Sequence, residues 1–521
     1  MLRYEDLPAQ LNVATWFVDR NLEEGRGGRT ALVTADGPTT YAELAGMTNR
    51  VGNVLASLGV GRGDRVLLAL NDGIDFVATW YGAQKIGVVT AEVYTYLQPH
   101  DYRYYLDYTE AVVVVADATT LDALREVRDA SRHLRRLLVV GVPDGELRPG
   151  ESSFDALVAA APDDLEPAPT TRDDVTIWKF TTGSTGAPKA CVHPTRSPVL
   201  SFDWYARGVL DIGPDDMVLP VPKLFFGYAR DLAALFPFGV GGGGIVFPER
   251  TTPERIFELI ARHRPTILVN VPTMMSAMVA HPEAGDQDLT CLRLCTSAGE
   301  ALPAELHRKW DRAFGVEVVD GIGSSEAYHI YVSNRPGQGR VGTVGRAVPG
   351  YAARVVDDAG ATVPDGEVGA LEVTGQTVAR EYWGAPEQSA ATFSGDTLLT
   401  GDLFVRDADG FLSYRGRVDD LLKVGGIWVA PSEVEACLIG HPDVLECAVV
   451  GHERDGLVQP RAYVVVRDGA SLTATALIGY ARERLSPHKR PREVRFVDVL
   501  PRTVNGKLDR EAVRRLDREE V

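Results

Sequence analysis

Apolar and polar residues alternate with two different periods along the first 120 residues. The segment TYAELAGMTNRVGNVLASLGV (40–60) places apolar residues three to four positions apart, which predicts a helix. DRVLLAL (64–70) is a short apolar run and predicts a buried strand. The order repeats in DFVATWYGAQKIGVVTA (75–91) and AVVVVAD (111–117). This alternation indicates an α/β fold with many parallel strands.

The same pattern continues to about residue 343, where its texture changes. Helices such as TPERIFELIARH (252–263) separate the apolar runs GGIVFP, TILVNVP, LRLCTSAG and EVVDGIG. From about residue 343 the chain is rich in valine and glycine and contains Asp-Gly turns. We therefore expect a large domain of mixed and parallel sheets flanked by helices, which ends in a compact β unit.

A smaller α/β pattern starts after RGRVDDLLKVGG. Pro431 and Ser432 open a predicted helix, in which Ser432 and Glu435 have the spacing of a capping box. ECAVVG, RAYVVV and EVRFVDV then predict strands, and LIGYARERL predicts a helix. We expect an N-terminal domain of residues 1–418 and a C-terminal domain of residues 419–521.

Composition and charge restrict the class of protein. A chain of 521 residues exceeds one ordinary core, and its 45% apolar and 24% charged residues are typical of a globular protein. A net charge of −18 provides no positive field for a nucleic acid or an anionic membrane. The start MLRYEDLPAQ lacks the apolar core of a secretory signal, and AVVVVA (111–116) is too short to span a bilayer. We expect a cytoplasmic protein that binds neither nucleic acid nor a membrane.

The cysteines do not form a recognisable framework. Their number is odd, and the one close pair has neither a second pair nor a nearby histidine, as a zinc site would need. They imply neither a set of disulfides nor a metal site. The five are Cys191, Cys291, Cys295, Cys437 and Cys447.

The loop TTGSTGAPK (181–189) contains groups that bind anions. Backbone N–H groups of a glycine-rich turn and small hydroxyl side chains donate hydrogen bonds, and Lys189 adds positive charge. It is not a Walker A loop, because Ala187 and Pro188 follow its second glycine, where that motif has lysine and a hydroxyl residue. Taken alone, the loop is either an anion site or a surface turn.

Three further motifs follow this loop in a specific order. They are GIGSSEAYHI (321–330), TGD (400–402) with YRGRVDDLLKVGG (414–426), and PRTVNGKLDR (501–510). Together with the loop they resemble the motifs of the adenylate-forming (ANL) superfamily, and the resemblance extends over essentially the full chain. Within that superfamily, KLFFGYARDL, CTSAGEALP and LLKVGGIWVAPSEVEA are most similar to benzoate-CoA ligases.

The resemblance implies a reaction in two halves. A carboxylate and ATP would give acyl-AMP and pyrophosphate, and the thiol of CoA would then give a thioester and AMP. The phosphate loop would close over the β- and γ-phosphates, Glu326 would bind Mg²⁺, and Lys507 would be the catalytic lysine of adenylation. The loop residues implied are Thr181, Thr182, Gly183, Ser184, Thr185, Gly186 and Lys189.

The same resemblance assigns the remaining nucleotide and CoA contacts. Ser325 would contact the α-phosphate, Asp402 the ribose hydroxyls and Arg417 the region between ribose and phosphate. Asp419 would be the hinge of a mobile C-terminal domain. Gly425 and Gly426 would line the tunnel for the pantetheine arm of CoA.

An acid pocket with flat apolar walls is also implied. The sequence departs from the family at Ala190, which replaces glycine after the loop lysine, at Tyr328, which is bulkier than the leucine of benzoate ligases, and at His488. These departures leave the identity of the acid open. The expected pocket residues are Tyr228, Ala229, Gly323, His329 and Ile330.

We interpret the sequence as an acid-CoA ligase for an aromatic, benzoate-like acid. Alternatives are an enzyme that performs only the thioester half-reaction, an adenylating enzyme that loads a carrier protein, and a non-catalytic nucleotide-binding component. The expected ligands are the acid, ATP, Mg²⁺ and CoA. The sequence leaves a homodimer open.

Overall fold

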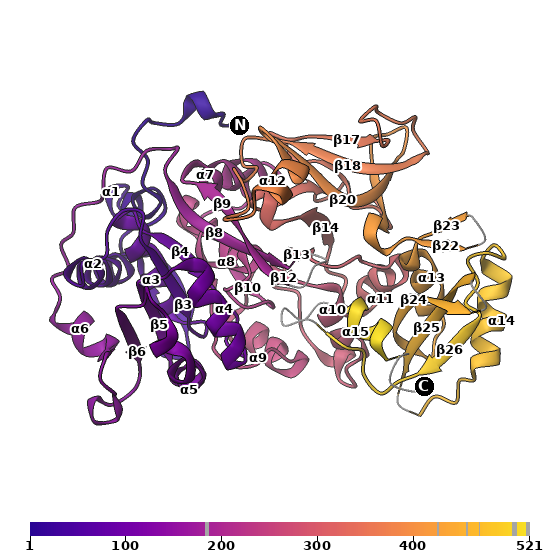
Figure 1. Ribbon diagram of the computed structural model, residues 1–521, viewed down its shortest axis with the longest axis horizontal. Helices are drawn as coiled ribbons and strands as arrows, with labels where there is room; N and C mark the ends of the chain where they lie inside the picture. The colour runs from indigo at the N-terminus through magenta and orange to yellow at the C-terminus, as the bar shows by residue number, and fades with distance from the viewer. Residues whose placement is uncertain (183–186, 425–426, 455–456, 468, 503–507, 517–521) are drawn as a thin grey trace.

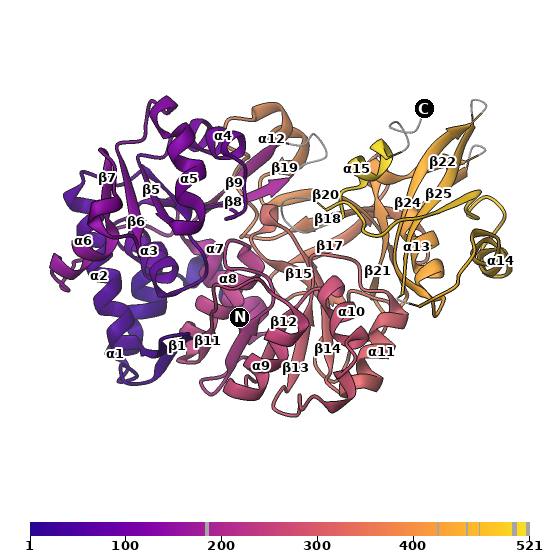
Figure 2. The same cartoon turned by 90° about the horizontal axis from the view of Figure 1, so that it is seen from below.

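The computed structural model describes residues 1–521 except 183–186, 425–426, 455–456, 468, 503–507 and 517–521. Within this described part the strands form five sheets, and helices pack around them (Figure 1). A second view, turned by 90°, again shows the last strands, in yellow, at the end of the molecule opposite the indigo N-terminal helices (Figure 2). The predicted α/β fold is confirmed.

The first sheet contains the predicted buried strands of the N-terminal region. Its strands lie in the order β7 (Glu151–Ser153), β6 (Arg136–Val140), β5 (Val113–Asp117), β3 (Arg65–Ala69), β4 (Val89–Glu92), β8 (Val175–Thr182) and β9 (Pro188–Pro194). Neighbours pair in parallel except β8 and β9, which form an antiparallel hairpin. Continuous apolar runs suit these strands because both faces of a parallel sheet are covered.

The second sheet is parallel at its centre and antiparallel at both edges. Its order is β16 (Arg346–Ala347), β15 (Ile330–Ser333), β14 (Val318–Gly323), β13 (Leu294–Ser297), β12 (Ile267–Asn270), β10 (Met217–Pro220), β11 (Gly243–Ile245), β1 (Thr30–Thr34) and β2 (Gly37–Thr40). A β-carbon on Gly244 would lie 2.0 Å from the carbonyl oxygen of Ala233, so the strand requires glycine there.

Helices cover these sheets and connect them. Thr40 and Glu43 form a capping box at the start of the predicted helix at 40–60. No helix in the described ranges has the length and apolar character needed to cross a membrane. The helices here are α1 (Arg20–Glu23), α2 (Tyr41–Ser57), α3 (Ile74–Lys85), α4 (Pro99–Thr109), α5 (Ala118–Val127), α6 (Phe154–Ala160), α7 (Arg196–Ser201), α8 (Gly227–Ala234), α9 (Pro253–His263), α10 (Pro272–Ala280) and α11 (Ala304–Phe314).

The α3 helix connects the cores of the two large sheets. It is buried continuously from Phe76 to Lys85, and Tyr81 donates a 2.7 Å hydrogen bond to the carbonyl oxygen of Ala234 in α8. A helix buried on all sides explains why its sequence is apolar beyond one stripe. Helix α8, which follows a strand of the second sheet, is therefore bonded to a helix that follows a strand of the first.

The third sheet is the compact β unit that the sequence predicts after residue 343. Its strands are antiparallel, and Asp402 lies directly opposite Arg417 on the neighbouring strand. The elements are β17 (Ala352–Val356), β18 (Val368–Thr374), β20 (Thr397–Arg406), β19 (Phe393–Ser394) and β21 (Leu412–Arg417), with α12 (Pro386–Thr392) beside them.

The C-terminal strands form two small sheets with their own apolar core. The predicted capping box is wrong: Ala430 is the N-cap residue and has no side-chain cap. Ser432 instead donates to the carbonyl oxygen of Arg415 at 3.2 Å, and Glu435 is buried and accepts from the N–H of Val449 at 2.7 Å. The elements are β22 (Leu422–Val424), β23 (Ile427–Val429), α13 (Pro431–Ile439), β24 (Val444–Arg454), β25 (Leu457–Val466), α14 (Ala474–Arg484), β26 (Glu493–Phe496) and α15 (Arg510–Arg515).

Candidate functional site

The β8–β9 hairpin carries the predicted phosphate loop. Thr181 pairs with Lys189 across the hairpin. The ammonium of Lys189 lies 5.0 Å from the centre of the Tyr382 ring. Gly183, Ser184, Thr185, Gly186 and the side chain of Thr182 lie outside the described part of the chain. The hairpin therefore places one predicted loop lysine beside an aromatic ring of the segment that follows the third sheet's β18 strand.

The turn that carries Ser325 and Glu326 packs directly on this hairpin. It is a short 3₁₀ helix, η8 (Ser325–Ala327), which begins after β14. The hydroxyl of Ser325 donates to the carbonyl oxygen of Phe180 at 2.9 Å, and the carbonyl oxygen of Ser325 accepts from Nε2 of His193 at 2.6 Å. Burial lowers the pKa of His193 to about 3, so the imidazole is neutral. Both strands of the hairpin therefore hold the turn.

The carboxylate of Glu326 is held by a third segment. Its Oε1 accepts a 2.8 Å hydrogen bond from the hydroxyl of Tyr382, and its carbonyl oxygen accepts from the N–H of Ala379 at 2.7 Å. Burial and the nearby Glu326 charge both raise the pKa of Tyr382, so its hydroxyl remains a donor. One oxygen of Glu326 has a fixed partner, and the group can still coordinate a cation through the other.

Tyr328 follows this turn with a strained backbone. Its φ of 75° and ψ of −53° correspond to the rare form of the γ-turn, which is unfavourable for a residue other than glycine. Such conformations cost about 1–3 kcal/mol and persist only where the surroundings enforce them. The strained residue lies between Glu326, a predicted nucleotide-site residue, and His329, a predicted acid-pocket residue.

Asp402 and Arg417 form an ion pair beside a buried tyrosine. Oδ1 of Asp402 lies 3.2 Å from Nη1 of Arg417, and Oδ2 of Asp419 lies 3.9 Å from Nη2. Burial, followed by the charges of Asp402 and Glu326, raises the pKa of Tyr331 well above its usual range. Asp402, Arg417 and Glu326 are therefore close enough to Tyr331 for their charges to act on its hydroxyl.

Two of the predicted acid-pocket residues, Tyr228 and Gly323, lie against a third, His329. Nε2 of His329 lies 3.4 Å from the carbonyl oxygen of Tyr228 in α8, and its ring packs on Tyr205 and Phe236. A β-carbon on Gly323 would lie 2.5 Å from the carbonyl oxygen of His329. Burial lowers the pKa of His329 to about 3. Ala229 follows Tyr228 in α8, and Ile330 begins β15.

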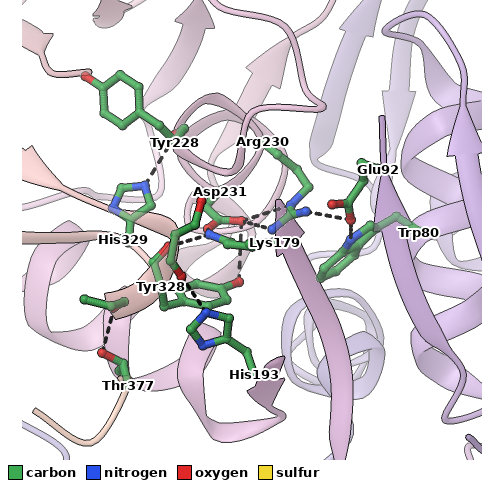
Figure 3. Close-up of polar contacts among 12 residues, drawn as sticks. Trp80, Glu92, Lys179, His193, Tyr228, Arg230, Asp231, Tyr328, His329 and Thr377 are labelled. Carbon is green, nitrogen blue, oxygen red and sulfur yellow. Dashed lines mark hydrogen bonds and ion pairs between the residues drawn. The ribbon is translucent and has the colours of Figure 1, made fainter. Parts of the chain in front are cut away.

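Sequence reasoning missed a group of buried charges next to the predicted acid-pocket residues. Lys179 in β8 contacts Asp231 in α8, and Arg230 contacts both Asp231 and Glu92 (Figure 3). All four side chains are at most 4% exposed. The available signal was the presence of charged residues inside the apolar segment VTIWKF and the helix GYARDL.

Several predicted residues of the C-terminal region lie outside the described residues, namely Gly425, Gly426 and Lys507. Close to Lys507 in sequence, Arg502 pairs with Glu446 at 2.8 Å and donates to the hydroxyl of Thr273 at 3.3 Å. This contact joins the C-terminal strands to α10 of the N-terminal region. Asp419 lies in η9 (Val418–Asp420), directly after β21, and its role as a hinge stays a prediction.

Comparisons with known proteins cover almost the whole chain. Residues 18–383 match the family "AMP-binding enzyme", and residues 433–507 match "AMP-binding enzyme C-terminal domain". A benzoate–CoA ligase of Thauera aromatica is 41% identical over 97% of this chain and 96% of its own length.

Solved structures agree with this similarity. An anthranilate CoA ligase, AuaEII, solved with anthranoyl-AMP, is 36% identical, and the match covers 100% of this chain and 99% of that one with a TM-score of 0.96. A benzoate CoA ligase from Burkholderia xenovorans LB400 is 38% identical, with coverage of 96% and 99% and a TM-score of 0.89.

Proposed function

This chain belongs to the AMP-binding enzyme family, and we propose that it is an ATP-dependent ligase that joins an aromatic carboxylic acid to CoA. A carboxylate oxygen attacks the α-phosphorus of ATP, the bond to the β-phosphate breaks, and pyrophosphate leaves. The thiolate of CoA then attacks the acyl carbon of the acyl-AMP, and AMP leaves. Both steps pass through crowded negative charge, so positioned cations and hydrogen-bond donors dominate catalysis.

One observation carries the proposal: the Ser325–Glu326 turn is hydrogen-bonded onto the hairpin that bears the phosphate loop. Motifs that are about 140 residues apart in sequence therefore meet at the place where a nucleotide's phosphates would lie. Lys189 would neutralise the phosphates, and the hydroxyl of Ser325 would approach the α-phosphate. Lys507 would bridge the acid carboxylate and the α-phosphate.

On the ribose side, Asp402 and Arg417 have complementary charges and lie on adjacent strands. A carboxylate accepts from two neighbouring hydroxyl groups at once, which suits a ribose. Arg417 orients this carboxylate and remains 44% exposed, so its other donors can reach an anion. We assign the nucleotide sugar to this pair.

Magnesium fits the site as a partner of ATP. The described residues contain no group of three or more metal-ligating side chains, so the protein would hold the ion through the single carboxylate of Glu326. Mg²⁺ commonly takes one carboxylate together with phosphate oxygens and waters. Its charge would neutralise the phosphates, while Tyr382 keeps the carboxylate oriented.

We assign the aryl ring of the acid to the surroundings of His329. Tyr228 and Phe236 offer flat apolar surfaces, and the histidine itself is neutral. Such walls suit an aryl ring. The relatives described above are named for benzoate and anthranilate, which agrees with an acid of this size.

A panel assay tests the proposal. Purified protein with Mg²⁺ and ATP should exchange labelled pyrophosphate into ATP when an aromatic acid is added, and should release the aryl-CoA when CoA is supplied. If no acid of a broad panel supported pyrophosphate exchange, the ligase proposal would be refuted. If synthetic acyl-AMP and CoA still gave product in that case, the enzyme would perform only the second half-reaction. Exchange without transfer to CoA would favour a carrier-protein acceptor, which transfer to a carrier's phosphopantetheine arm would establish.

A further inference from the structure

Lys179 holds a central place in the buried charge group between the acid and nucleotide sites (Figure 3). Its Nζ donates to Oδ2 of Asp231 at 2.5 Å and to the carbonyl oxygen of Tyr328 at 2.6 Å. The same nitrogen lies 3.6 Å from the centre of the Tyr328 ring. An ammonium has three donors, two of which are directed at these oxygens, and its charge lies over the aromatic face. Lys179 is 4% exposed, so its contacts are with these neighbours.

The charges around Lys179 balance one another. Arg230 donates to Oδ1 of Asp231 through Nε at 3.0 Å and Nη2 at 2.9 Å, and its Nη1 lies 2.7 Å from Glu92. Glu92 also accepts from the indole N–H of Trp80 at 2.6 Å. Two cations thus face two anions. Because apolar side chains can often replace a buried ion pair without loss of stability, stability alone gives little reason for this arrangement.

The two partners of Lys179 belong to different substrate sites. Asp231 lies three residues after Tyr228 in α8, the helix that contributes to the acid pocket. The Tyr328 carbonyl belongs to the strained residue that follows Glu326 and precedes His329. The rings of Tyr328 and His193 pack in a T-shaped arrangement with their centres 5.2 Å apart. The lysine is therefore a bridge between the acid helix and the nucleotide turn.

We propose that Lys179 is a positioning residue for adenylation: anchored by Asp231, it holds the Tyr328 carbonyl and so keeps the Ser325–Tyr328 turn in its strained, productive shape. This inference rests on the proposed ligase function. Without the bridge, the strained residue relaxes and Glu326 and His329 move relative to one another. Adenylation needs acid and nucleotide aligned together, whereas transfer to CoA starts from an acid and AMP that are already joined.

The variant Lys179→Met tests the bridge, since methionine keeps an unbranched side chain and removes the charge and donors. Its acid-dependent pyrophosphate exchange should lose about 100-fold in kcat, because displacement of reacting groups by about 1 Å has that cost. Thioester formation from synthetic acyl-AMP and CoA should change less than about threefold, since that substrate is covalently assembled.

Lys85→Met is the matched control. Lys85 is a buried lysine that also pairs with a carboxylate, Asp19 at 2.9 Å, but it lies in α3 and contacts Asn49 in place of the turn. It should leave the ratio of the two half-reactions unchanged even where it lowers thermal stability. Equal loss of both half-reactions in Lys179→Met, or unchanged exchange, would overturn the inference. Absence of exchange in the unmodified protein would instead refute the ligase itself.

If Lys179→Met does not fold, the pH dependence of the unmodified protein carries the test. Burial lowers the pKa of Lys179 to about 8, so its charge is present below that pH and is lost above it. Exchange should fall as the pH rises through about 8, while transfer of a supplied acyl-AMP to CoA should not fall. A flat exchange profile over this range would overturn the inference.

The neighbours of Lys179 cannot produce the same step. Burial lowers the pKa values of His193 and His329 to about 3, so both stay neutral. Burial also raises the pKa of Tyr328 well above its usual range. Although burial opposes it, the charges of Arg230 and Lys179 lower the pKa of Asp231. The charged and titratable groups that face Lys179 are Asp231 and Arg230 from α8, Glu92 from β4, Cys191 and His193 from β9, and Tyr328 and His329 from the turn. Burial raises the pKa of the Cys191 thiol well above its usual range, so this group does not titrate near pH 8 either.

Discussion

The hydroxyl of Tyr382 donates a 2.8 Å hydrogen bond to Oε1 of Glu326. The two residues come from different parts of the chain: Glu326 follows a strand of the second sheet, and Tyr382 lies between β18 and α12 beside the third sheet. The proposed metal ligand therefore does not depend on its own turn alone. Its orientation is set where two sheets meet.

Tyr382→Phe should raise the Mg²⁺ concentration needed for half-maximal pyrophosphate exchange by about tenfold, because loss of a hydrogen bond that orients a metal ligand typically weakens metal binding by about that factor. The phenyl ring keeps the packing against Lys189. The measurement is the Mg²⁺ concentration that gives half-maximal exchange. Glu326→Gln should lose more activity at every concentration. An unchanged Mg²⁺ requirement in Tyr382→Phe would show that the hydrogen bond does not orient a metal ligand.

Asp402→Asn should raise the KM for ATP by about tenfold, because the neutral amide loses a charge-assisted acceptor for the ribose and for Arg417. The matched control is Glu372→Gln, which breaks another cross-strand ion pair of the same sheet, to Arg354. Both substitutions should change the free energy of unfolding by less than about 1 kcal/mol, since the pairs are partly exposed. Equal KM values in the two variants would remove Asp402 from the nucleotide site.

Thr273→Val tests the contact between the N- and C-terminal regions. Valine keeps the volume of threonine but cannot accept the 3.3 Å hydrogen bond from Arg502. A hydrogen bond of this kind contributes about 0.5–1.5 kcal/mol. The observed orientation of the C-terminal region relative to the N-terminal region should therefore become about two- to tenfold less populated. The rates of the two half-reactions, measured separately, should then move in opposite directions. Parallel changes would mean that the contact does not select an orientation.

The sequence predicted helices and strands correctly where the spacing of apolar residues stayed regular over a whole segment. VLLA in β3 and VVVAD in β5 appear as parallel strands of the first sheet, and the central strands of the second sheet are also parallel and largely buried. The predicted capping box of Ser432 and Glu435 is wrong because the Glu435 carboxylate accepts hydrogen bonds from Val449 and Arg510, which are distant in sequence. Local spacing describes a possible cap but does not include such tertiary competitors.

The site shows the same limit. The resemblance to family motifs identified Ser325, Glu326 and Asp402, because each of them lies in a short sequence motif. It did not identify Lys179 or Asp231, because a charged residue in a buried strand gains meaning only once the sheet and α8 face one another. Buried ion pairs between distant segments require the assembled core, since each partner alone would be an unpaired charge.

His329→Phe should alter the choice of acid more than the stability of the fold. Phenylalanine preserves the ring packing on Phe236 and Tyr205 but removes Nδ1, a buried nitrogen without a hydrogen-bond partner among the described residues. An acid whose hydroxyl or amino substituent reaches Nδ1 should lose about tenfold in kcat/KM, since a buried hydrogen bond contributes about 1–3 kcal/mol to discrimination. Unsubstituted benzoate should change little.

The acid should also bind without a pH step near neutrality. Because burial keeps the pKa of His329 at about 3, its ring stays neutral throughout pH 5 to 8 and only a partner of neutral imidazole is recognised. The KM for the acid, measured from pH 5.5 to 7.5, should therefore be flat in both the unmodified protein and His329→Phe. A rise in KM centred near pH 6.5 that His329→Phe abolishes would mean that a charged histidine, exposed to solvent when the acid is absent, takes part in binding.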